Sequence, residues 1–116
     1  MKHMKTARKR AMFSPLFASQ TVQAAMMTLK PGQSSSDEPE NEHPKAEQWL
    51  YVVAGSGKGR VGDRSLRISA GSLLLIEKGE KHKITATGEK PLVTVNFYAP
   101  PAYSADGDVK PTAKRR

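Results

Sequence analysis

The side chains that could bind a metal or move a proton are few in this chain of 116 residues: three histidines and no cysteine. Without cysteine, neither a disulfide framework nor a thiolate metal site can form. His3 lies in a charged N-terminal stretch, where a solvated side chain is expected. The sequence shows no acid and base at a spacing that would indicate a catalytic pair. Imidazole chemistry therefore depends on His43 and His82.

His82 follows an apolar run that ends at a glycine. The run at residues 73–76 lies between Gly71 and Gly79 and has the length of a buried strand, far short of a membrane span. A tight turn at Gly79 would then deliver His82 to the start of the next strand.

Short strand signals separated by glycine turns recur along the rest of the chain. We expect strands at residues 20–30, 47–55, 58–61, 65–69, 71–77, 82–87 and 91–100. In the last of these, alternation places one set of side chains on a common face: Leu92, Thr94, Asn96 and Tyr98. For residues 11–18 we expect a loop, because Ser14 and Pro15 interrupt a short apolar segment; it should tuck Phe13, Leu16 and Phe17 against the strands.

Seven or eight strands without a helix predict an all-β barrel or sandwich in one domain. An immunoglobulin-like sandwich is the rival, but the sequence lacks its Cys-Trp-Cys pattern.

The net charge of +8 is concentrated at the two ends of the chain. Residues 1–10 carry five Lys or Arg and residues 110–116 carry four, whereas the segment between them has ten basic against eleven acidic residues. We therefore expect a disordered basic tail at residues 1–10, a barrel at 11–103 and a second basic tail at 104–116. No specific nucleic-acid partner and no membrane segment are predicted, and a cytoplasmic location is the default.

Two spacing patterns connect these residues to a known fold. Gly71, Gly79 and His82 fit the pattern G-x5-P-x-G-x2-H-x3-N, with Glu77 at the proline position. The pattern G-x5-H-x-H-x3-or-4-E-x6-G fits less closely. When it is counted back from Gly55, its acidic, second histidine and first histidine positions fall on Gln48, His43 and Asn41. On these motifs the chain resembles the cupin superfamily over residues 29–100, as a small single-domain bacterial cupin.

The resemblance implies a double-stranded β-helix, or jelly-roll barrel, and a ligand set. Cupins usually hold one divalent ion such as Mn, Fe, Ni, Zn or Cu at these motif positions, which implies His43, Gln48 and His82 as ligands. Asn41 would be a weaker fourth donor without charge. Glu42 and Glu47 flank the motif, and alternation turns Glu47 outward if Gln48 points inward. The alternative is a wet pocket in which the two histidines are only hydrogen-bonded.

Two functions follow from the resemblance, and the sequence leaves open whether the protein is an enzyme. One is a metal-dependent cupin that acts on a small oxygenated molecule, as an isomerase or dioxygenase would. The other is a non-catalytic cupin that binds a carbohydrate-like or carboxylate ligand. In either case, the expected ligand contacts are Asn41, Asn96 and Thr94. Trp49 and Tyr51 should point outward, and with the exposed strand edges they favour a homodimer.

Overall fold

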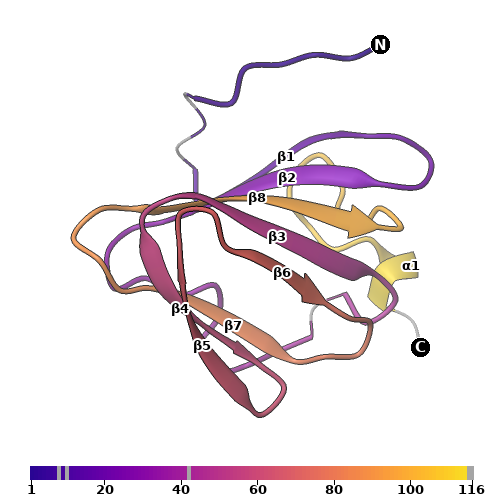
Figure 1. Cartoon of the computed structure of the whole chain (residues 1–116). Helices are drawn as coiled ribbons and strands as arrows, with labels where there is room; N and C mark the ends of the chain where they lie inside the picture. The colour runs from indigo at the N-terminus through magenta and orange to yellow at the C-terminus, as the bar shows by residue number, and fades with distance from the viewer. Residues whose placement is uncertain (8, 10, 42, 115–116) are drawn as a thin grey trace.

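The computed structural model describes residues 1–7, 9, 11–41 and 43–114 (Figure 1). In this part of the chain there are eight strands and one short helix: β1 (Phe13–Ala18), β2 (Gln23–Leu29), β3 (Glu47–Ala54), β4 (Ser56–Val61), β5 (Arg64–Ser69), β6 (Leu73–Ile76), β7 (His82–Ala86), β8 (Leu92–Ala99) and α1 (Pro111–Lys114). The strands expected from the sequence are confirmed, with ends that shift by a few residues.

The strands form two antiparallel sheets that face each other (Figure 1). One sheet has the order β1-β2-β8-β3-β6 and the other the order β5-β4-β7. Burial alternates strictly along β3 and β8, since one face of each strand looks into the space between the sheets. Most of that space is filled by apolar side chains: Met27, Leu29, Leu50, Val52, Ile68, Leu74, Ile84, Ala86 and Leu92.

Toward one end of the barrel the inward positions become polar. On β3, Gln48 lies beyond Leu50 and Val52, and on β8, Thr94 and Asn96 lie beyond Leu92; all are buried. An apolar plug therefore closes one end, and polar side chains gather toward the other end.

The loop prediction for residues 11–18 is wrong, because most of this segment forms β1. It pairs with β2 along the outer edge of the larger sheet, and the pairing is irregular between Pro15 and Ala18. An edge strand tolerates proline where its missing N–H would face the open side. Phe13 does pack inward, with its ring centroid 4.6 Å from that of Tyr103.

The two ends of the chain make different contacts. Residues 1–7 form neither strand nor helix, and Lys2 lines a surface pocket with Phe17, Val22 and Phe97. Near the other end, Tyr103 pairs with Val109, and Ala113 is 2% exposed in a small core with Ala46 and Tyr98. The domain limits at residues 10 and 103 stay predictions, although Val109 and Ala113 pack against the barrel. No helix in the described residues could cross a membrane.

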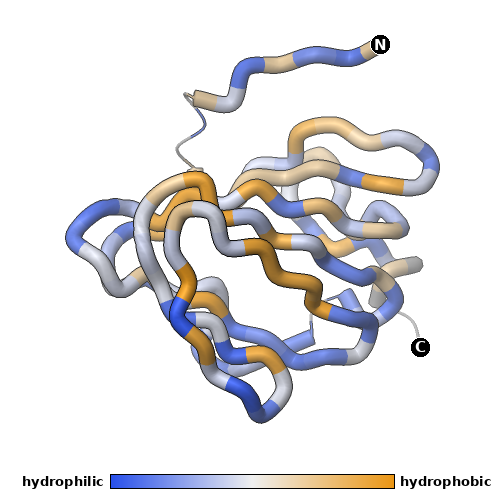
Figure 2. Tube along the Cα trace, viewed as in Figure 1, coloured by the Kyte–Doolittle hydropathy of each residue, from blue (hydrophilic) through white to orange (hydrophobic). Residues whose placement is uncertain are grey.

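The outer face of the larger sheet carries an exposed apolar patch. Trp49 lies opposite both Leu75 and Phe97, and Tyr51 lies opposite Leu73. Each of these five side chains is at least 40% exposed. We call them the apolar outer patch; β6, which supplies two of them, is orange along its length in Figure 2. The outward direction predicted for Trp49 and Tyr51 is thus confirmed.

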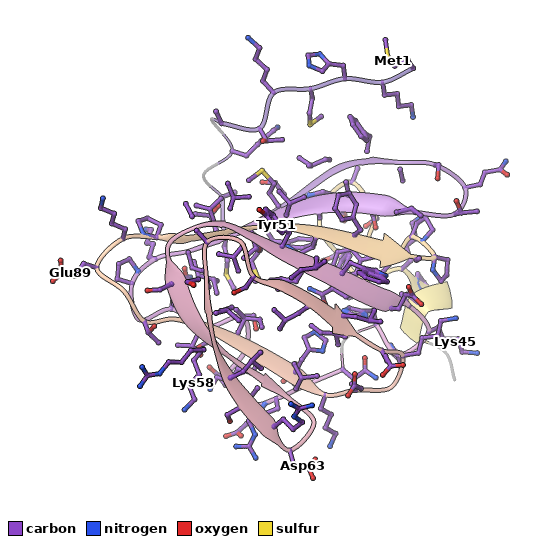
Figure 3. All side chains as sticks on the ribbon, in the orientation of Figure 1. Met1, Lys45, Tyr51, Lys58, Asp63 and Glu89 are labelled. Carbon is purple, nitrogen blue, oxygen red and sulfur yellow. The ribbon has the colours of Figure 1, made fainter. Side chains whose placement is uncertain are left out.

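The outer face of the smaller sheet is basic. Lys58 lies opposite Arg67, and Arg60 lies opposite Lys83, so like charges are paired directly across strands. The other outward residues of β4, β5 and β7, all of them described, are serines and a threonine. Figure 3 places Lys58 on this sheet, whereas acidic Asp63 sits at the tip of the β4–β5 hairpin. Directly opposed like charges are locally destabilising.

Candidate functional site

A pocket of about 180 Å³ opens at the polar end of the barrel. This end lies near Lys45 in Figure 3, whereas Glu89 marks the opposite end. The wall includes aromatic, hydroxyl and ionisable side chains from both sheets and from the segments beside them: Phe13, Ser35, Ser36, Glu40, Gln48, His82, Tyr98 and Tyr103.

His43 sits at this end in a tight turn just before β3. Its backbone carbonyl accepts a hydrogen bond from the N–H of Ala46 (2.9 Å), and its ring Nδ1 lies 3.1 Å from the carbonyl oxygen of Ala46. A carbonyl can only accept, so Nδ1 donates in this contact when it carries the ring proton. The Nε2 atom is 3.0 Å from Oε1 of Gln48. The side chain is 1% exposed.

His82 is placed by the turn that the sequence predicts. Gly79 has φ of +87°, in the left-handed region that favours glycine, and the turn is closed by a hydrogen bond from the N–H of Glu80 to the carbonyl of Glu77. His82 then begins β7, and its backbone exchanges two hydrogen bonds with Glu40. The ring Nδ1 lies 3.1 Å from the Glu80 carbonyl. That contact leaves Nε2 of His82 as the bare nitrogen.

The structure brings both imidazoles together, with ring centroids 5.1 Å apart. Burial lowers the pKa of His82 below its ordinary value of 6.5, the hydrogen bond to the Glu80 carbonyl opposes that shift, and the neighbouring His43 adds to it. His82 is therefore a neutral imidazole at neutral pH. Neutral imidazole is the form that binds metals.

Gln48 joins the histidines to a buried row of hydrogen bonds. Its Nε2 donates to Oδ1 of Asn96 (2.8 Å), and Nδ2 of Asn96 donates to Oγ1 of Thr94 (3.0 Å). The hydroxyl of Thr94 donates to the carbonyl of Met27 (3.1 Å). Asn96 and Thr94 are fully buried and do not line the pocket. Their contact with a ligand stays a prediction, whereas their connection to Gln48 is part of the structure.

The remaining candidates lie at different distances from the pocket. Glu47 points outward, as alternation predicts, and accepts a hydrogen bond from the Trp49 indole (2.6 Å). Asn41 is partly buried, and its Nδ2 has no hydrogen-bond partner among the described residues. Glu40, rather than Asn41, lines the pocket. Glu42 lies outside the described residues.

An aromatic wall beside His43 was not identified from the sequence as part of the site. The ring centroid of His43 is 5.0 Å from that of Tyr98 and 6.1 Å from that of Tyr103. The sequence indicated an inward position for Tyr98, because it shares the inward face of β8 with Asn96. There was no such indication for Tyr103, since it lies beyond the last strand. Tyr103 is held by Gln23, whose side chain accepts from the N–H groups of Ala102 and Tyr103 and donates to the Tyr103 carbonyl.

The donor groups fit a divalent first-row ion. In the tautomer of neutral imidazole with its proton on Nδ1, Nε2 of His43 and Oε1 of Gln48 are two acceptors that face each other at 3.0 Å. Two such acceptors repel unless a cation lies beside both. Ligands at right angles around an ion, with bonds of about 2.1 Å, are about 3 Å apart, which matches this separation. Among the described residues no cluster of three or more His, Cys, Asp or Glu forms a metal site, so an ion here would rest on two imidazoles and neutral amide oxygen.

Comparison with known proteins gives a consistent family match. The model of the Cupin domain family matches residues 25–98. Among curated proteins, the chain is 31% identical over 72 residues to the tetracenomycin polyketide synthase protein TcmJ of Streptomyces glaucescens. That match covers 62% of this chain and 46% of TcmJ, so the chain spans less than half of that relative.

Solved structures share the architecture over most of the chain. A crystal structure of a Bacillus halodurans protein superposes with a TM-score of 0.78 at 29% identity, over 90% of this chain and 80% of that one. An oxalate decarboxylase of Lactobacillus farciminis, solved as a formate complex, gives a TM-score of 0.64 at 31% identity. It is matched over 73% of this chain and 26% of its own length.

Proposed function

Because this chain belongs to the Cupin domain family and has the double-stranded β-helix fold of that family, we propose that its pocket binds a divalent first-row metal ion and a small oxygenated molecule beside it. His43, Gln48 and His82 would hold the ion. Asn41 is the proposed fourth donor, and its place could instead be taken by Glu40 or Glu42.

The observation that carries this proposal is the 3.0 Å approach of Nε2 of His43 to Oε1 of Gln48, which are two facing acceptors in the tautomer of neutral His43 with its proton on Nδ1. Each histidine has its Nδ1 on a backbone carbonyl, Ala46 for His43 and Glu80 for His82. Such carbonyl contacts are the usual way in which proteins fix the tautomer and ring orientation of metal-binding histidines. The same contacts leave both Nε2 atoms for the ion.

A metal ion bound there would act as a Lewis acid toward an oxygen of the substrate, or would bind O₂. The chain's own residues supply the rest of the environment. Phe13, Tyr98 and Tyr103 form an apolar wall that excludes water from one side of the pocket. Glu40 and the hydroxyls of Ser35 and Ser36 supply the polar side.

The size of the pocket limits the ligand. Its volume of about 180 Å³ is below the roughly 300–1,000 Å³ of pockets that hold drug-sized ligands. A molecule with a few carbon atoms and oxygen donors is therefore the best fit, as in an isomerase-like or dioxygenase-like reaction. The match to an oxalate decarboxylase solved with formate supports a small carboxylate.

A non-catalytic binding protein is the second candidate. It is favoured by the composition of the pocket wall. Among the described residues that line the pocket, Glu40 alone has a carboxylate, so no second acid is paired with it there. Cupins of this kind would hold a carbohydrate-like or carboxylate ligand without converting it. We propose the same pocket residues for both functions. Measurements of metal content and of substrate turnover would distinguish the two functions.

We also propose that two copies of the chain associate through the apolar outer patch. Its five side chains form a continuous surface over β6, β3 and β8. Contiguous exposed apolar surface of this kind is typical of a protein interface.

The test begins with elemental analysis of purified, tag-free protein. We expect about one equivalent of Mn, Fe, Ni, Zn or Cu per chain, or stoichiometric uptake when one of these ions is titrated. His82→Ala should abolish that uptake, while His3→Ala, which removes a histidine in the charged N-terminal tail, should leave it unchanged.

Asn41→His is the sharper variant, because a gain cannot be attributed to misfolding. It should strengthen metal binding by adding a third imidazole. An unchanged affinity in a folded protein would mean that Glu40 or Glu42 takes that position. If His82→Ala also left metal uptake intact, the proposed metal site would be refuted.

A further inference from the structure

The buried row of hydrogen bonds beside the pocket has an acceptor at each end. It runs through four side chains between two backbone carbonyl oxygens, in the order Met27 O, Thr94, Asn96, Gln48, His43 and Ala46 O. All five contacts are between 2.8 and 3.1 Å. A carbonyl oxygen can only accept, so neither end of the row supplies a proton.

When His43 is a neutral imidazole, the form that binds metals, counting protons along this row shows that one contact must lack a proton. A hydroxyl, a primary amide and a neutral imidazole each give one donor along the row and accept on the other side. Four such groups supply four protons for five contacts. At one contact, therefore, two lone pairs face each other, whichever way the two amides are turned.

The orientation of the side chains sets the position of that contact. Thr94 donates to Met27, Asn96 to Thr94, and Gln48 to Asn96. On the other side, His43 donates to the Ala46 carbonyl in the tautomer with its proton on Nδ1, which is the one that leaves Nε2 for a metal. In this tautomer the contact without a proton is the one between Gln48 and His43, the two ligands of the proposed metal site.

We propose that Thr94 and Asn96 are positioning residues that keep the amide oxygen of Gln48 turned toward His43. The inference rests on the proposed metal site and gives Thr94 and Asn96 a role that requires no contact with the metal. Thr94 provides the anchor, because its hydroxyl has the Met27 carbonyl as a partner and so offers its own lone pair to Asn96. Asn96 in turn presents its amide oxygen to the NH₂ group of Gln48, which leaves the amide oxygen of Gln48 turned toward His43.

Removing the hydroxyl of Thr94 reverses the preferred orientation of the two amide side chains in the row. In Thr94→Val, three side chains with three donors remain for three contacts, from Asn96 to the Ala46 carbonyl. All three contacts are then satisfied only if both amides turn over. The NH₂ group of Gln48 would then donate to Nε2 of His43. That arrangement occupies the lone pair of His43 and points a donor at the place of the metal.

Thr28 offers a matched control on the neighbouring strand. Its Oγ1 is buried, like that of Thr94, but has no hydrogen-bond partner among the described residues. Thr28→Val therefore removes a buried hydroxyl from the other face of the same sheet without changing the row. Thr94→Ser, which keeps the hydroxyl, provides the rescue variant.

The experiment compares metal dissociation constants and thermal stability for the four proteins. Titration with Zn²⁺ or Ni²⁺ should show affinity weakened by at least about tenfold in Thr94→Val, as is common when a group that orients a metal ligand is lost. Thr28→Val and Thr94→Ser should stay close to the wild type. If Thr94→Val lost stability but kept wild-type metal affinity, Thr94 would be merely structural and the inference would be overturned.

A second measurement tests the inference even without metal. Nuclear Overhauser spectra should show the Gln48 amide protons near Asn96 in the wild type and near the His43 ring in Thr94→Val. Amide protons that stay near Asn96 in the variant would overturn the inference. A wild type that binds no metal, with the amide turning over as expected, would refute the proposed metal site alone.

Discussion

Gln23→Leu is expected to destabilise the protein strongly and to loosen one wall of the pocket. The Gln23 side chain makes three buried hydrogen bonds to the backbone of Ala102 and Tyr103, at 2.7, 3.0 and 2.9 Å. Leucine has a similar volume and can make none of them. The segment that carries Tyr103 would then lose its attachment to β2.

The magnitude follows from the number of bonds. A buried hydrogen bond contributes about 1 kcal/mol net, and a buried polar group left without a partner costs about 1–3 kcal/mol. Three lost bonds, with two N–H groups and one carbonyl left behind, predict a loss of at least about 3 kcal/mol in the free energy of unfolding. This is a large part of the roughly 5–15 kcal/mol typical of a folded domain.

Urea unfolding followed by circular dichroism measures this loss, and Gln33→Leu is the control. Gln33 makes its backbone contact, to Lys30, near the surface, so its replacement should cost much less. Chymotrypsin adds a local readout, because Tyr103 lies buried in the held segment and the chain should be cleaved after it faster in Gln23→Leu. If Gln23→Leu cost no more than Gln33→Leu, and cleavage after Tyr103 were unchanged, the segment would not be held in this way.

Two further predictions concern pH and association. Because burial lowers the pKa of His82, the unfolded chain binds more protons than the folded one between the lowered value and 6.5. Stability should therefore fall as the pH drops below about 6.5, and His82→Gln should flatten that slope in urea unfolding series; an unchanged slope would contradict the assignment. Light scattering at micromolar concentration should give twice the mass of one chain for the wild type and one chain mass for Trp49→Lys. Leu66→Lys, at an exposed position of the smaller sheet, is the control, and a wild-type monomer would refute the proposed interface.

Most strands could be predicted because their signals are local. In β3 the residues that face the core alternate with residues that face solvent, and glycine turns mark the ends of the neighbouring strands. β1 was missed because Ser14 and Pro15 are turn residues in most contexts, and only the position of this segment at the sheet edge makes a strand acceptable.

The pocket was less predictable than the strands. The resemblance predicted that His43, Gln48 and His82 lie close together, because its motifs include the turn at Gly79 and the alternation of β3. Tyr103 and the packed segment around Ala113 could not be predicted, because their positions depend on contacts with Gln23 and Ala46, far away in the sequence. A disordered tail was expected at 104–116 because four Lys or Arg are concentrated at 110–116.

The basic outer face of the smaller sheet makes the stability of the fold depend on the surrounding electrolyte. Lys58 and Arg67, and Arg60 and Lys83, repel each other across strands that must stay paired for the pocket wall to form. Dissolved ions screen such surface repulsion over about 10 Å at 0.1 M salt. The barrel should therefore hold together better in salt than in dilute buffer, the opposite of a protein stabilised by surface ion pairs. Since β7 belongs to this sheet and carries His82, the ionic medium acts on the same strand that supplies a proposed metal ligand.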